Sequence, residues 1–168
     1  MKKHSIFRIT LLVVIINILF FAVNIYIFAG NDTKAPSLIS FDFEPKMVDT
    51  SLSSQTITFT IHVTDDLSGL DHGVFDFKSP SGNQHLEGWL SPYNLITGDK
   101  LDGVYLETVD LPQNSEAGTW RIDDFILYDE TNNQRELDRA DLLLAGFPTS
   151  FLNGIKKPVL YLPIIYRK

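Results

Sequence analysis

The chain contains no cysteine, so no disulfide bond can contribute to its stability. It is also poor in positive charge, with 14 Lys and Arg against 21 Asp and Glu. Three of the basic residues and none of the acidic ones precede residue 31, which leaves a net charge of −10 from there onward. A surface of this charge repels phosphate groups, which argues against nucleic acid as a partner.

Sequence motifs of a catalytic site are also missing. Ser, His and Asp occur without the nucleophile-elbow pattern of hydrolases, and nothing indicates an insertion that would form a glycosidase cleft. His62, His72 and His85 could ligate zinc, but no two of them have the ligand spacing of a single element. We therefore expect a protein that is not an enzyme.

A long uncharged segment covers residues 9–30. As a helix it would cross a hydrocarbon core of about 30 Å. Lys2, Lys3 and Arg8 precede it, so the positive-inside rule places the rest of the chain outside the cytoplasm. Cleavage after Ala29 would leave bulky Ile27 where a small residue is preferred, which favours a signal anchor in residues 1–30. A cleaved signal peptide is the alternative, and the membrane is a predicted partner through residues 9–30.

From Asp32 onward the dominant hydrophobic period is two residues. In residues 56–64, Ile57, Phe59 and two further apolar residues alternate with Thr and His. Such alternation predicts a strand with one buried face. Further strands are predicted at residues 38–43, 73–78, 84–90, 103–111, 118–128 and 147–152, and one short helix at residues 139–145.

One predicted strand changes phase in its middle. Trp120 and Ile122 point to one face, whereas Phe125 and Leu127 point to the other. One extra residue at positions 123–124 would form a β-bulge and return all four side chains to the core.

About seven short strands separated by turn signals, with one brief helix, predict an all-β antiparallel sandwich. We place this domain at residues 32–153, after the N-terminal hydrophobic helix. Residues 154–168 are then a C-terminal tail or an extra edge strand.

Several segments in order resemble bacterial immunoglobulin-like surface domains. They are Asp32–Pro36, Thr64–Leu70, Ser79–Asn83, Gly118–Trp120, Asp129 with Asn132 and Asn133, and Ala140–Phe151. The loop at residues 129–133 departs from the usual pattern because it lacks glycine. The resemblance implies an immunoglobulin-like sandwich that acts as a spacer or adhesion unit at the cell surface, with a surface protein or a glycan as partner.

Acidic and amide side chains gather in three of the predicted loops. If successive strands alternate in direction, the segment before the first strand and the loops after Val63 and Tyr128 lie at one end of the sandwich. Calcium prefers about six to eight oxygen ligands, which these loops could supply. The candidate ligands are Asp32, Asp65, Asp66, Asp71, Asp129, Asn132 and Asn133. The alternative is that they are ordinary turn formers, and it is favoured because no loop carries the alternating ligand spacing of an EF-hand. Resemblance to calcium-bound extracellular sandwiches favours the cation site.

Aromatic residues suggest a second function. Trp89 and Tyr93, with Tyr105, could stack on sugar rings if they are exposed together, whereas Trp120 is expected in the core. The leading hypothesis is a non-catalytic module for adhesion or protein interaction outside the membrane. The alternative is a carbohydrate-binding module that uses Trp89 and Tyr93.

Overall fold

The computed structural model describes residues 32–154. The predicted membrane segment at residues 9–30 lies outside these residues, as does all of the predicted tail except Gly154. Within residues 32–154, no helix has the length and apolar character needed to cross a bilayer.

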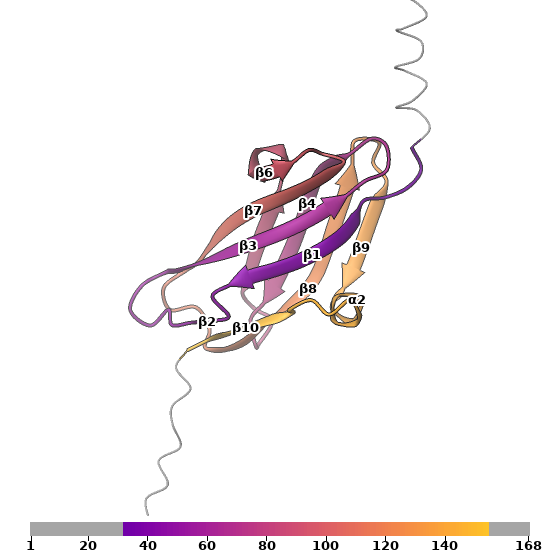
Figure 1. The fold of residues 1–168 in the computed structure, drawn as a ribbon. Coiled ribbons are helices and arrows are strands. Elements are labelled where there is room, and N and C mark those ends of the chain that lie inside the picture. Colours follow the sequence, from indigo (N-terminus) through magenta and orange to yellow (C-terminus); the bar gives the residue numbers. More distant parts are fainter. Residues whose placement is uncertain (1–31, 155–168) are drawn as a thin grey trace, which may run out of the picture.

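The described residues form two β-sheets, which confirms the predicted all-β class (Figure 1). The four-stranded sheet has the order β1 (Ser37–Glu44), β3 (Gln55–Thr64), β7 (Asp102–Leu111), β6 (Leu95–Gly98). The six-stranded sheet has the order β2 (Met47–Val48), β10 (Ser150–Asn153), β8 (Gly118–Asp129), β4 (Leu70–Lys78), β5 (His85–Leu90), with β9 (Gln134–Asp138) paired to β8. A 3-10 turn, η1 (Pro92–Asn94), and one helix, α2 (Arg139–Leu144), complete the fold.

The paired strands are antiparallel except β2 and β10, which are parallel. The strand predicted at residues 147–152 begins only at Ser150, and β2, β6 and β9 were not predicted. The predicted helix is present, because the Asp138 carboxylate caps it by accepting a hydrogen bond from Asp141 N at 2.9 Å. Gly146, which has a φ of 82°, follows its end.

Aromatic rings from both sheets fill the interior. The rings of Phe59 on β3 and Phe75 on β4 have centroids 4.5 Å apart. The remaining buried rings of this cluster are Phe41, Phe43, Phe77, Trp120, Phe125 and Phe151. Their edge-to-face and tilted contacts add about 0.5–1.5 kcal/mol per pair to the burial of apolar area, so the two sheets are held together face to face.

The predicted bulge in β8 is confirmed. Asp76 pairs with Asp124 and the next residue of β4, Phe77, pairs with Ile122, so Asp123 is the extra residue. Trp120, Ile122, Phe125 and Leu127 are all buried as a result. The bulge keeps one face of the strand on the core although the sequence period is interrupted.

The predicted gathering of loops at one end is also confirmed. Ser37 pairs with Thr64, and Leu70 pairs with Asp129, so the segment before β1 meets the β3–β4 and β8–β9 loops there. Glu130 N donates a hydrogen bond to Gly69 O at 3.1 Å between two of these loops. We call this end the acidic pole; β10 leaves the domain at the opposite end (Figure 1).

Gly88 provides a test of the packing, because a Cβ atom there would lie 1.9 Å from Cζ of Phe75. We expect Gly88→Ala to lower the free energy of unfolding by about 1–3 kcal/mol, through overpacking of the core. Urea denaturation measures the change. Glu87→Ala, at an exposed position of the same strand, is the control and should change stability by no more than about 0.5 kcal/mol; equal effects of the two variants would contradict the packing at Gly88.

Candidate cation site and exposed aromatic row

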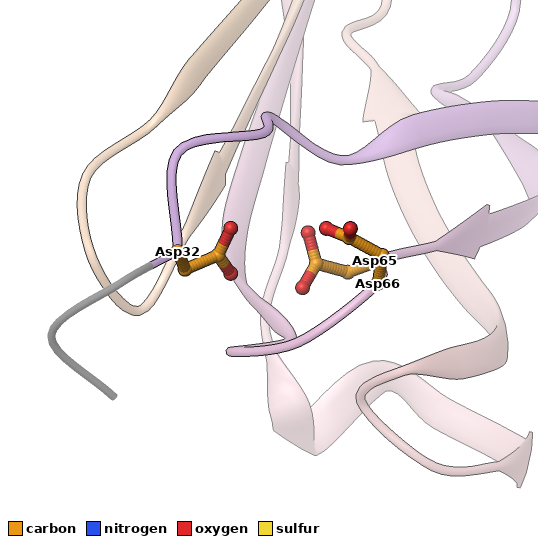
Figure 2. A group of neighbouring side chains, drawn as sticks. All are labelled: Asp32, Asp65 and Asp66. Carbon is orange, nitrogen blue, oxygen red and sulfur yellow. The ribbon is translucent and has the colours of Figure 1, made fainter. Parts of the chain in front are cut away.

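Three of the predicted ligand residues come together at the acidic pole. Asp32 lies before β1, and Asp65 and Asp66 begin the β3–β4 loop. Each offers an oxygen atom within 4.8 Å of the others. Figure 2 shows the three side chains converging from these two segments. Among the residues that the structure describes, this is the one group of three potential metal-ligating side chains with this spacing.

Backbone amides hold two of these carboxylates in place. Asp65 Oδ1 accepts hydrogen bonds from Leu67 N at 3.1 Å and Gly69 N at 2.6 Å, which fixes the start of the loop. Asp32 Oδ2 accepts one from Ser68 N at 2.8 Å, and Oδ1 accepts one from Lys34 N at 3.1 Å. Asp32 therefore joins the segment before β1 to the β3–β4 loop.

The charges at the cluster are unequal. The pKa of Asp32 is lowered, mainly by the Ser68 hydroxyl and also by the amides of Lys34 and Ser68, against the opposing effect of burial. Lys34 Nζ lies 2.5 Å from Asp66 Oδ2 and is the nearby positive group, and this pairing raises the pKa of Lys34. Three carboxylates thus share one ammonium group, which favours an added cation.

The other predicted ligands do not join the cluster. Asp71 is exposed and pairs with His72 Nδ1 at 2.7 Å. The buried carboxylate of Asp129 accepts hydrogen bonds from the amides of Thr131 and Asn133, both at 2.8 Å. Asn132 adopts a left-handed conformation, with a φ of 64°. Asp129 therefore shapes its own turn, as the turn-former alternative predicted, whereas Asp71 lies within β4.

An aromatic row crosses the outer face of the six-stranded sheet. The rings of Trp89 and His72 are stacked with centroids 5.6 Å apart, and those of His72 and Tyr128 with centroids 4.6 Å apart. The three residues come from β5, β4 and β8, and Trp89 is 56% exposed. We call this set the aromatic row. Sequence reasoning missed His72 and Tyr128 as its members, because the stacking depends on strand register.

The remaining aromatic candidates have different positions. Tyr93 on η1 is 99% exposed. Tyr105 is only 1% exposed, so the expectation that it could stack on a sugar was wrong; its ring completes the inward face of β7. The three histidines, for which the sequence argued against zinc ligation, each pair with a different carboxylate: His62 with Asp102, His72 with Asp71 and His85 with Asp76.

Four carboxylates form a second row on the same outer face. Asp76 pairs in register with Glu87 on one side and Asp124 on the other, and Asp124 pairs with Asp138. Burial, followed by the charges of Asp123 and Asp76, raises the pKa of Asp124. We call these four residues the acidic row. Like charges directly opposite each other destabilise a sheet, and the pairing of Asp76 with His85 and the capping of α2 by Asp138 offset part of this repulsion.

Comparison with known proteins gives one family. A family profile described as "Domain of unknown function (DUF7035)" matches residues 31–161. The chain belongs to this family. The match covers the whole of the two-sheet domain, from the segment before β1 to beyond β10.

Other comparisons are more distant. A crystal structure described as the ApaA protein from Bordetella pertussis is similar to 75% of this DUF7035 chain and 99% of its own, with 15% sequence identity and a TM-score of 0.36. No curated protein matches the chain.

The hydrogen bonds that the Asp32 carboxylate accepts from the amides of Lys34 and Ser68 make the stability of the domain depend on pH. In the presence of a chelator at about pH 7, we expect Asp32→Asn to lower the free energy of unfolding by about 1 kcal/mol. The folded-state pKa of Asp32 is below 3.8, so this contribution is present above pH 3.8 and is lost as the pH falls through the folded-state pKa. Thermal unfolding of both chains, at about pH 7 and at a pH below the folded-state pKa of Asp32, measures this contribution. Glu44→Gln, at an exposed position of β1, is the control, and a difference between Asp32→Asn and the original chain that persists unchanged in acid would contradict the assignment.

Ionisation of Asp124 should lower the stability of the folded state, whereas ionisation of Asp32 raises it. The raised pKa of Asp124 means that ionisation costs the folded state stability above pH 3.8. We expect Asp124→Asn to raise the free energy of unfolding by about 0.5 kcal/mol near neutral pH. This gain should disappear below pH 3.8, where the carboxyl is protonated in both states. A gain of the same size in acid would show that charge is not its cause.

Proposed function

We propose that the chain is a non-catalytic, immunoglobulin-like binding module held on the outer side of a membrane by residues 9–30. The orientation rests on the uncharged segment and the basic residues before it. Strand order supports the immunoglobulin-like assignment: β1, β3, β7 and β6 take the places of strands A, B, E and D, and β10, β8 and β4 those of G, F and C. In this assignment β5 corresponds to C′, and β9 with α2 forms an insertion between F and G.

The aromatic row is the observation that carries a binding function. Trp89 is a large ring that the fold leaves more than half exposed, although aromatic residues usually bury most of their area. Its ring stacks on His72, and His72 stacks on Tyr128, so these side chains are ordered before any ligand arrives. Ordered aromatic side chains lose little conformational entropy on binding, which makes them effective anchors in protein interfaces. The leading proposal is adhesion or protein interaction through this face.

Carbohydrate binding is the second candidate, and the exposure of Trp89 and Tyr93 favours it. The interplanar angles of the two stacked pairs are 11° and 15°, so each ring covers a face of its neighbour, and a sugar would stack on the face of Trp89 that is turned away from His72. The acidic row lies on the same face. Its member on β5 is Glu87, which is two residues from Trp89. The charge of the acidic row would repel sulfated or otherwise anionic sugars. A glycan ligand should therefore be neutral or positively charged.

The test is binding of the purified 168-residue chain, held in lipid nanodiscs free of detergent, to intact cells and to an array of neutral and sulfated glycans. We expect Trp89→Ala to weaken binding by about tenfold or more, as for a central aromatic anchor. Leu52→Ala, which truncates an exposed side chain between β2 and β3, is the matched control and should leave binding unchanged.

Pretreatment of the cells separates the two candidates. Loss of binding after protease treatment alone would identify a protein partner, whereas loss after glycosidase treatment, with capture by neutral glycans on the array, would identify a carbohydrate. Binding by Trp89→Ala equal to that of the original chain would refute the role of the aromatic row.

A further inference from the structure

We propose that Asp32, Asp65 and Asp66 bind a divalent cation of the calcium class, and that the Lys34 ammonium group occupies its place as a tethered substitute when the cation is absent. The site lies at the acidic pole, where the segment after residue 31 joins the domain. It is separate from the aromatic row, so the inference goes beyond the proposed binding function.

Two buried oxygen atoms at the site have no hydrogen-bond partner. They are Asp65 Oδ2 and Ser68 Oγ, and Ser68 is only 8% exposed. The Ser68 hydroxyl lies close enough to Asp32 to lower the pKa of that carboxyl, yet it makes no hydrogen bond of good geometry. Buried polar atoms in native proteins nearly always have a partner. A cation bound between the carboxylates would supply one to both oxygens.

Lys34 is a poor permanent partner for the cluster. Its side chain is 74% exposed and that of Asp66 is 48% exposed, and ion pairs of such exposure are weak. One ammonium group also leaves two of the three carboxylates uncompensated. A divalent cation can displace it, because carboxylate oxygens, the Ser68 hydroxyl and water provide the oxygen ligands that calcium prefers.

Occupancy of the site would fix the joint between the domain and the segment before it. Asp32 stands at the start of the domain, whereas Asp65 and Asp66 belong to the β3–β4 loop. A cation shared by them adds to the existing hydrogen bond from Ser68 N to Asp32. If residues 9–30 attach the chain to a membrane as proposed, a bound cation would also fix the orientation of the domain relative to that membrane. Cation binding itself does not depend on this attachment.

Calorimetric titration of the 168-residue chain in detergent micelles with calcium chloride tests the site. We expect one saturable site with a dissociation constant no weaker than about 1 mM, the range of extracellular calcium modules. Asp66→Asn removes an exposed ligand that makes no backbone hydrogen bond and should weaken binding by about tenfold or more.

Lys34→Gln distinguishes a cation site from a merely structural cluster. Loss of the competing ammonium group should tighten calcium binding by about fivefold. Lys78→Gln is the matched control: it removes the same charge from another exposed Lys–Asp pair, with Asp123 on the six-stranded sheet, and should leave the affinity unchanged. Calcium should also slow amide hydrogen exchange in peptides that cover residues 32–36 and 65–69.

Either of two results would overturn the proposal: no saturable binding up to about 10 mM calcium, or equal tightening by Lys34→Gln and Lys78→Gln, which would indicate a diffuse charge effect. The proposed binding function fails independently, since Trp89→Ala should retain the calcium affinity of the original chain whatever its effect on ligand binding.

Discussion

Contact between phenylalanine rings of opposite sheets is the interaction on which the other features depend. The chain has no disulfide bond to join the sheets, so the rings centred on Phe59 and Phe75 must do so by packing alone. Gly88 leaves room for the Phe75 ring at the edge strand β5. Once the inner faces are matched in this way, the strand register determines which side chains meet on the outer face and at the ends.

Both candidate sites follow from that register. The segment before β1 and the β3–β4 loop reach the same end because β1 and β3 are antiparallel neighbours, and this brings Asp32 to Asp65. On the outer face, the pairing of His72 with Tyr128 and the neighbouring position of Trp89 build the aromatic row. Neither site depends on an enclosed cavity. Each is a rim or face feature that a rigid interior keeps in place.

Sequence patterns predicted the elements that are governed by burial. Alternation gave the main strands, and the interrupted phase between Ile122 and Phe125 gave the bulge, because buried apolar residues leave a period that can be read locally. β9 was missed because most of its residues are exposed and polar, so no alternation is visible. The two-residue β2 is too short to carry a pattern.

The candidate site was predictable only in part, for a different reason. The direction of successive strands placed the acidic loops together, but it could not tell which oxygens were free. Asp129 uses its carboxylate within its own turn, whereas Asp65 keeps one oxygen unpartnered. The members of the aromatic row are far apart in sequence, and their stacking follows from the register of three strands. The chain enters the domain at the acidic pole, before β1, and leaves it at the opposite end, after β10 (Figure 1). Tension applied through these two ends would pull along the strands, so the hydrogen bonds of β1 with β3 and of β10 with β8 would share the load in shear, an arrangement suited to a mechanical link.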